Sequence, residues 1–581
     1  MANTNTGLAA GGLTIQKYNN FRGVDFTDAN VSESRSPDAL NMWKNYKTLG
    51  KQIETRPDVE LQLTMSNTIY GLFFYTINRV NHYIIHSGVS LYDYNPVTKE
   101  MITLKETGMN PAKSSAFIFN NIFFILDGIN YLEYDGKTLK SVEGTIPTIA
   151  IHNMNKGETK YIQEANLLTD YCYEEFLTDG KSTEFPLTMK EVSDVKVYFI
   201  DGLSETEITE GITIDKVNGL ITFDEAPEKK ANSPSIKVKY AKESDGADVI
   251  KKCKLSCMFD NRVFFSGNQD YPNMLVWCGL DDPRYIGITS YAPQGSGISQ
   301  IKALVPGNNA LWVFKEPDHE NTTIFYNVPT EVYDNKLEDT VKTYASSHSS
   351  ISTGCKATGI NFNDDIIFFS DRGMEGISGD ITTEQVLGHR STLVDRKLLN
   401  ETNYEDMVLA EWEGYLLVII DNVVYLADSN QKVSNNDHFE YEWFYWELDH
   451  NIKTASVNNN ILYLGSDEGV IYTLTNNERD REIESYWTTK SDDCNYPQML
   501  KTTNKRGFKS DVSGDEITIS VRTDNNDFET LGTYINTKGY IVAKLKRKKW
   551  NKIQLKFGSN KPFGIYGITL ETYIGSYVKR S

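Results

Sequence analysis

The chain has 581 residues, with 59 Lys and Arg against 79 Asp and Glu, which gives a net charge of −20. Because 39% of the residues are hydrophobic and 12% aromatic, the chain can bury a sizeable core and is not disordered as a whole. The negative balance argues against a protein that wraps nucleic acid or lies on an anionic membrane, but it permits a conduit that nucleic acid passes through.

The first 60 residues carry no strong strand or helix period. Met1–Thr14 has neither a basic start nor an apolar core, so we expect no secretory signal there. We interpret residues 1–60 as an extended arm that packs on its own fold or on a neighbouring chain.

A repeated unit begins after the arm and fills residues 61–155 and 246–490. In one copy, Asn120-Asn121 leads into the apolar run Ile122–Leu126, and the turn Asp127-Gly128 leads into Tyr131–Tyr134. Asn, Asp and Gly supply the positive φ that tight hairpins need. Similar units are Asp260–Asn268, Asn363–Gly373, Glu413–Tyr425 and Asn458–Tyr472, with less regular relatives at Thr68–Tyr94 and Gly307–Tyr326.

These strands are apolar on both faces, which is typical of sheets packed between neighbouring sheets. The units therefore predict an all-β fold, a β-propeller of about six to seven blades. A pair of stacked β-sandwiches is the alternative.

The pattern changes twice along the chain. Residues 156–245 show clean alternation of polar and apolar positions, which predicts a small β-sandwich inserted into the propeller. Residues 491–581 alternate in the same way and predict a C-terminal β-sandwich. The basic run Lys546–Lys549 stands out there, either as a solvated edge that blocks strand pairing or as a contact to a negatively charged partner.

Motifs for catalysis and cofactor binding are missing from the sequence. No zinc-protease, phosphate-binding or dinucleotide fingerprint occurs, so we expect no cofactor and no metal. His82 and His86 flank a strand-like run, where residues four apart lie about 13 Å from each other, too far for one metal. Cys253 and Cys257 lack a second ligand pair, and buried free thiols are the expectation. A glycosidase would need a defined carboxylate pair, and none stands out.

The most distinctive stretch is Asp260–Ile286, which reads as strand, Gly-Asn turn, strand and the turn Asp281-Asp282-Pro283. Its sequence RVFFSGNQDYPNMLVWCGLDDPRY resembles the β-propeller stabilisation, or nozzle, proteins of tailed bacteriophages. The N-terminal FRGVDF, RSPDALNM and ETRPD segments resemble the opening of those proteins. FLTDGKSTEFPL, from Phe176, resembles the start of the small β-domain that such tail proteins often insert.

The resemblance implies a non-enzymatic structural protein of the virion, assembled in the host bacterial cytoplasm. Such proteins form rings, expected here to be hexameric, below the portal and adaptor, and they retain the genome and conduct it during ejection. The implied partners are copies of the chain, the portal-adaptor and other tail proteins, and viral DNA that passes without sequence-specific binding; no membrane insertion is expected. Candidate assembly contacts are Arg22, Asp25, Arg35, Asp38, Asn41, Arg56, Lys546 and Arg547.

Other functions remain open from the sequence alone. A minor head or baseplate protein of a long-tailed phage fits the same resemblance. A glycan-binding or receptor-binding propeller fits the abundance of Tyr and Trp, and a propeller glycoside hydrolase is a further alternative.

Overall fold

The computed structural model describes residues 12–577, apart from 28–30, 49, 51, 231–232, 319–320, 350, 352, 379–385, 436–437, 475–480 and 546–548. The chain divides into two compact units: one holds Phe73–Cys355, and the other holds the described residues before and after that segment. Strands dominate both units, and the helices are short: α1 (Gly246–Lys251), α2 (Asp395–Leu398) and a 3-10 turn at Tyr404–Asp406. Of the helices in this part of the chain, none has the length and apolar character that a membrane crossing needs.

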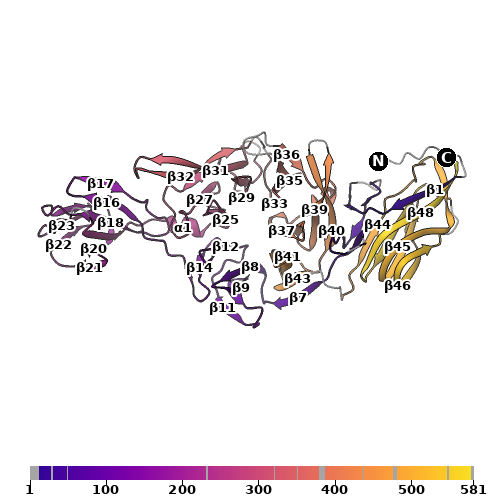
Figure 1. Ribbon diagram of the computed structural model, residues 1–581, viewed down its shortest axis with the longest axis horizontal. Coiled ribbons are helices and arrows are strands. Elements are labelled where there is room, and N and C mark those ends of the chain that lie inside the picture. The colour runs from indigo at the N-terminus through magenta and orange to yellow at the C-terminus, as the bar shows by residue number, and fades with distance from the viewer. Residues whose placement is uncertain are drawn as a thin grey trace. The chain divides into compact units, whose positions relative to one another are not determined.

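Seven antiparallel sheets in the described chain share one plan, in which consecutive strands pair with their neighbours (Figure 1). The first four sheets are β8 (Ile69–Ile77), β9 (Val80–Ser87), β10 (Ser90–Tyr94) and β11 (Met101–Lys105); β12 (Ser115–Phe119), β13 (Ile122–Leu126), β14 (Tyr131–Tyr134) and β15 (Leu139–Ser141); β25 (Leu255–Phe259), β26 (Arg262–Ser266), β27 (Met274–Trp277) and β28 (Tyr291–Pro293); and β29 (Ile301–Gly307), β30 (Ala310–Lys315), β31 (Ile324–Asp334) and β32 (Asp339–His348).

The remaining three sheets follow the same order. They are β33 (Gly359–Phe362), β34 (Asp365–Ser370), β35 (Gly373–Ser378) and β36 (Val386–His389); β37 (Val408–Trp412), β38 (Tyr415–Ile420), β39 (Val423–Asn435) and β40 (His438–Glu447); and β41 (Ile452–Asn458), β42 (Ile461–Ser466) and β43 (Val470–Leu474), completed by β7 (Val59–Thr64). A last blade completed by a strand from the other end of the repeat array is the strand topology of a seven-bladed β-propeller. The predicted fold class, all-β with a β-propeller, is confirmed.

Each of the seven sheets joins its first and second strands through a two-residue turn with positive φ at both positions. Such turns match the right-handed twist of the flanking strands, and Asn, Asp and Gly adopt them most readily. The turns are Asn78-Arg79, Asn120-Asn121, Asp260-Asn261, Asn308-Asn309, Asn363-Asp364, Glu413-Gly414 and Asn459-Asn460. The second strands that follow are buried on both faces, as in β30, β34 and β38.

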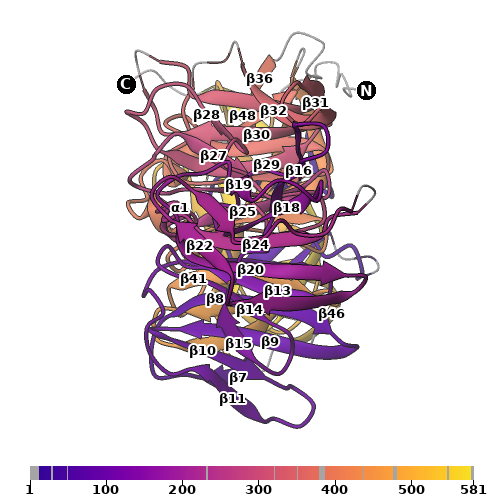
Figure 2. The same cartoon turned by 90° about the vertical axis from the view of Figure 1, so that its left-hand side faces the viewer.

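The inserted domain holds two sheets with a core of their own (Figure 2). The larger sheet contains β16 (Thr148–Asn153), β17 (Glu158–Tyr161), β18 (Tyr171–Leu177), β20 (Ser193–Asp201), β21 (Ser204–Ile208) and β24 (Ile236–Ala241); the smaller contains β19 (Glu184–Pro186), β22 (Ile212–Asp215) and β23 (Leu220–Phe223). Phe176, Phe185 and Phe223 pack edge-to-face between them. The larger sheet begins at Thr148, before the predicted boundary at 156, because β16 pairs with β18.

The C-terminal strands, predicted as a β-sandwich over residues 491–581, form one nine-stranded sheet together with strands of the N-terminal arm. Along one edge, β45 (Met499–Thr523) pairs with β48 (Phe563–Tyr577) through its first part and with β47 (Ile553–Ser559) through its last part. Along its other edge it pairs with β46 (Glu529–Ala543). The other members are β44 (Ser485–Thr488) and the arm strands β1 (Leu13–Tyr18), β4 (Ala39–Leu40), β5 (Met42–Trp43) and β6 (Ile53–Thr55).

The arm also reaches a propeller blade. Its strands β2 (Gly23–Val24) and β3 (Arg35–Ser36) extend the sheet β37–β40, where Val24 pairs with Trp443. Gly23 is required at this contact, since a Cβ there would lie 2.4 Å from the Trp443 carbonyl oxygen. One continuous core joins the arm, this blade and the C-terminal sheet, so the arm packs on its own chain.

Candidate functional site

The arm is fixed to strand β40 by a buried ion pair. The Arg35 guanidinium donates from Nε and Nη2 to the two carboxylate oxygens of Glu442 at 2.9 and 2.8 Å. The side chain of Glu442 is fully buried, and that of Arg35 is 15% exposed. Burial lowers the pKa of Arg35, but the hydrogen bonds and charge of Glu442 outweigh it, so the pKa lies above its ordinary value. Arg22 lies 3.5 Å from the same carboxylate.

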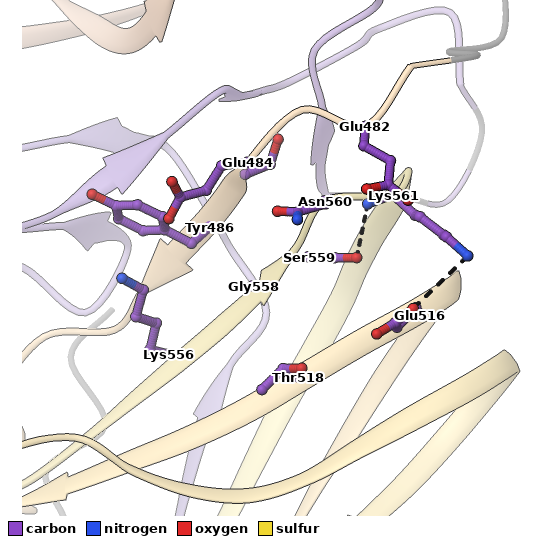
Figure 3. A pocket seen from close by; sticks show the side chains of 11 residues that line it. Glu482, Glu484, Tyr486, Glu516, Thr518, Lys556, Gly558, Ser559, Asn560 and Lys561 are labelled. Atoms are coloured by element: carbon purple, nitrogen blue, oxygen red, sulfur yellow. Dashed lines mark hydrogen bonds and ion pairs between the residues drawn. The ribbon is translucent and has the colours of Figure 1, made fainter.

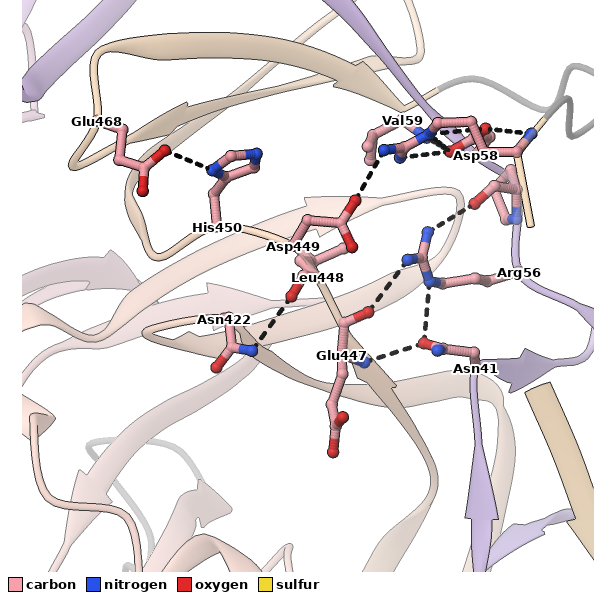
Figure 4. Close-up of polar contacts among 12 residues, drawn as sticks. Asn41, Arg56, Asp58, Val59, Asn422, Glu447, Leu448, Asp449, His450 and Glu468 are labelled. Atoms are coloured by element: carbon pink, nitrogen blue, oxygen red, sulfur yellow. Dashed lines mark hydrogen bonds and ion pairs between the residues drawn. The ribbon is translucent and has the colours of Figure 1, made fainter. Parts of the chain in front are cut away.

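A second tie centres on Asn41, shown in Figure 4. Its side-chain oxygen accepts hydrogen bonds from Arg56 Nε and from the Glu447 backbone N–H, both at 2.9 Å. Its side-chain nitrogen donates to the Glu484 carbonyl at 2.9 Å. Arg56 is 1% exposed and donates to the carbonyls of Pro57 and Glu447 as well. Asn41 therefore holds the arm, the end of β40 and the entry to β44 together.

The next arm residue with a charge, Asp58, continues this network. Arg481 donates from Nη2 to Asp58 at 2.6 Å and from Nη1 to Asp449 at 2.8 Å. Burial raises the pKa of Asp58, but the hydrogen bonds from Arg481 lower it by a larger amount. The pKa of Asp58 therefore lies below its ordinary value. Beside Asp449, His450 contacts Glu468 at 2.9 Å (Figure 4).

The six candidate assembly residues that the structure describes all make contacts inside the chain. Besides those above, Asp25 accepts hydrogen bonds from the Thr27 backbone and hydroxyl, and Asp38 accepts one from the Tyr486 hydroxyl at 3.1 Å. Lys546 and Arg547 lie outside the described residues. A contact of any of the eight to another chain stays a prediction.

Sequence reasoning did not identify the partners of these residues. Glu442 lies between Tyr441 and Trp443 in an aromatic strand, and a carboxylate in such a run is the signal of a buried ion pair. Glu447 takes part in the network around Asn41 mainly through its backbone N–H and carbonyl. Backbone groups are the same in every such residue, so the sequence could not predict this contact.

The Asp281-Asp282-Pro283 turn anchors the root of the inserted domain. Asp282 accepts hydrogen bonds from the Arg284 N–H and the Thr145 hydroxyl, both at 3.0 Å. Arg284 pairs with Glu133 at 2.6 Å. The buried Asn166, in the segment that leads back into the domain, donates to the carbonyls of Thr145 and Arg284. The end of the most distinctive stretch is thus the joint at the root of the inserted domain, and the rest of the stretch contributes β26 and β27 to a blade.

A polar pocket of about 390 Å³ lies on the C-terminal sheet (Figure 3). Glu516 forms an ion pair with Lys561 at 3.8 Å, and the Lys556 ammonium lies 3.5 Å from the centre of the Tyr486 ring. The desolvation of Tyr486 and the charge of Asp38 raise the pKa of its hydroxyl well above the ordinary value. The lining residues are Glu482, Glu484, Ser485, Tyr486, Glu516, Thr518, Lys556, Gly558, Ser559, Asn560 and Lys561, none of which the sequence analysis selected.

The metal-ligating side chains are dispersed over the described residues. Among the described residues, no cluster of three or more His, Cys, Asp or Glu could hold a metal ion. His82 bonds to Asp93 at 2.6 Å, whereas His86 bonds to Ser114 at 3.0 Å, so the two histidines have separate partners. The cysteines, including Cys253 and Cys257, are free thiols.

Comparison with known proteins does not assign the chain to a family. No protein-family model and no curated protein matches the chain. Among solved structures, the computationally designed Ika8 protein is similar at 10% identity and a TM-score of 0.32, over 71% of this chain and 98% of that one. BamB from Moraxella catarrhalis is similar at 12% identity and a TM-score of 0.32, over 72% of this chain and 99% of that one. Likenesses of this size carry no argument about function.

Proposed function

We propose that this chain is a structural protein of a tailed bacteriophage particle, a ring-forming nozzle or stabilisation component below the portal and adaptor. The proposal starts from the resemblance of three segments in one order along the chain. Those segments contribute the arm, the inserted domain and the joint at its root.

The observation that carries the proposal is how the arm is used. Residues that bear the resemblance, from Gly23 through Arg35 and Asn41 to Arg56, tie distant segments together through strand pairing and buried hydrogen bonds. Near the ends of the chain, β1 pairs with β48 over six residue pairs. Chain ends usually fray unless they are tied down. A chain tied in this way suits a component that must hold its shape while a genome passes.

The mechanism in this proposal is mechanical and electrostatic. Rings of the chain stack below the adaptor, retain the packaged genome and release it at infection. A net charge of −20 on each copy repels DNA phosphates, which keeps the conduit from binding its cargo.

The test is to look for the chain in purified particles. Mass spectrometry should find it at a fixed, low copy number, and gold-labelled antibody should mark the tail or portal vertex. Absence from particles, or labelling spread over the capsid, overturns the proposal.

The pocket on the C-terminal sheet favours glycan binding as a second candidate function. Carboxylates, lysines, hydroxyls and an amide beside a tyrosine ring can bond to the hydroxyl groups of a sugar. A glycan array should then show binding that Glu516→Gln and Lys556→Ala both weaken at least tenfold. Equal binding by the wild type and both variants overturns this candidate, and release of cleaved sugar would instead indicate the hydrolase alternative.

A further inference from the structure

Four strands of the C-terminal sheet lie in the order β46, β45, β48, β1. One row of side chains crosses all four, because Val542 lies opposite Lys509, Lys509 opposite Thr569, and Thr569 opposite Lys17. Directly opposed residues share one face of a sheet, as do residues two apart on a strand. Tyr540 and Val542 at one side, and Leu13, Ile15 and Lys17 at the other, therefore lie on the same face.

Both outer strands have an open edge. Within the part of the chain that the structure describes, β46 pairs only with β45 and β1 only with β48. Natural proteins usually protect such edges with charges, prolines or short strands. Here β46 runs for 15 residues.

Exposed apolar side chains accompany both edges. Tyr540 is 76% exposed and Val542 43% on β46, and Ile15 is 49% exposed and Leu13 41% on β1. Leu13 lies opposite Tyr573, which is also exposed. These apolar side chains line the two edges, with β45 and β48 between them, so a further strand at either edge would cover them.

The two open edges together point to another copy of the chain, because the same sheet offers β1 at one side and β46 at the other. Together β1 and β46 carry Lys17, Lys538 and Glu529 as their charged residues, in a chain of net charge −20. Two copies of charge −20 repel each other over most of their surface, whereas the low charge of these two strands lets copies approach at the edges. On the same face, Asp511 lies opposite Tyr540 and Glu571 lies opposite Ile15.

We infer that β1 of one copy pairs with β46 of the next, so that the C-terminal sheets continue from copy to copy around the ring; this inference rests on the proposed function. The three strand pairings are all antiparallel, so β46 and β1 run in opposite directions. Copies placed head to tail in one orientation then meet in an antiparallel pair, and Ile15 of one copy lies beside the Tyr540–Val542 side of the next. A head-to-tail contact generates a closed ring when the rotation from one copy to the next closes.

The contact is small for a stable pair of proteins, which usually buries about 1,600 Å². Closure of a ring supplies the remaining stability, because each copy is held at two edges at once. The inference therefore predicts few free dimers and a cooperative change from monomer to ring.

Cysteine cross-linking tests the pairing. Ile15→Cys and Val542→Cys, both conservative changes at exposed positions, are made in separate preparations, mixed, concentrated and treated with a short bismaleimide. We expect cross-linked dimers in the mixture and ladders in the double variant, with each single variant free of covalent cross-links. Dimers within one single variant indicate a two-fold contact and overturn the head-to-tail pairing.

Matched controls separate the possible failures. Ile102→Cys, an exposed isoleucine on β11, replaces Ile15→Cys in a parallel mixture and should give no cross-link with Val542→Cys. The wild-type chain gives the background of its own thiols, of which all but Cys257 are buried. If electron microscopy shows rings but the mixture fails to cross-link, the edge pairing is overturned and the proposed function stands. If cross-linked rings form but the chain is absent from particles, the proposed function fails and the edge pairing stands.

Discussion

The seven repeated sheets and the N-terminal arm are built by different means. Each sheet is organised by neighbours in sequence, with a two-residue turn of positive φ between its first two strands. The arm has only short local pairings among its described residues, β2 with β3 and β5 with β6, and is placed by partners far along the chain: Arg35 and Glu442 are 407 residues apart. Local turns therefore determine the blades, whereas long-range strand pairing, buried polar contacts and a shared core determine the position of the arm.

The largest effect is expected when the ion pair of the arm is broken. Glu442→Ala removes the bidentate partner of the half-buried Arg35 and leaves Asp25, at 3.8 Å, as a weaker one, which should cost about 3 kcal/mol. Thermal unfolding should begin at a lower temperature, and protease should cleave the arm first. The control is Glu205→Ala, which removes a pair with Lys237 at a 44% exposed carboxylate and should cost less than about 1 kcal/mol. Equal effects of the two variants would contradict the long-range role of Glu442.

A local ion cluster should give a smaller effect that depends on pH. His389 bonds to Glu375 at 3.1 Å and to Asp395 at 2.6 Å, all within one short segment. Burial lowers the pKa of His389, but these two carboxylates raise it to about 10, above the ordinary 6.5. The folded state therefore keeps a proton that the unfolded state loses between pH 6.5 and about 10.

The stabilisation by His389 is fully present below pH 6.5 and disappears as the pH rises through about 10. His389→Gln should thus lower the unfolding midpoint most at about pH 6, and its difference from wild type should shrink steadily toward about pH 10. The exposed His348 provides the matched substitution, His348→Gln. A gap between wild type and His389→Gln that stays constant with pH would show that packing, and not charge, is responsible.

The close approach of the arm to β40 gives the next effect. Gly23→Ala places a Cβ 2.4 Å from a backbone oxygen, which cannot move away as a side-chain end could, so the arm must shift. Overpacking of this kind costs about 1–3 kcal/mol. Gly567→Ala is the control, because its nearest neighbour would be 3.5 Å away. Hydrogen exchange should rise at β2 and β3 in the first variant, and no change there would show that the arm tolerates displacement.

The sequence alone could predict the blades because their signals are local. Asn120-Asn121 and Asp260-Asn261 predict turns, and the apolar runs that follow them predict buried strands. The change to strict alternation likewise marked the inserted domain. The all-β class and the propeller could be inferred in this way.

The tie points of the arm could not be predicted. The strand Leu13–Tyr18 alternates as any edge strand does, so nothing in it specifies Ile568–Tyr573 as its partner. Arg56 donates hydrogen bonds to the backbone carbonyls of Pro57 and Glu447. Every residue has such a carbonyl, so the sequence does not show which ones Arg56 contacts. The pocket depends on the same long-range pairing, because Tyr486 and Lys556 come together only when β44 joins β47.

The smallest effect is expected at a single blade turn. Asn309 has φ of 59° between β29 and β30, and it is exposed. Asn309→Ala should cost about 1 kcal/mol, because Ala lacks the polar side chain that eases the left-handed conformation. Asn309→Gly removes the same side chain but relieves the backbone, so it should be close to neutral. Hydrogen exchange should rise only at β29 and β30 in the alanine variant. If it rose along β31 and β32 as well, the turn would organise the whole sheet, and the contrast between local turns and distant ties would be weaker than the structure indicates.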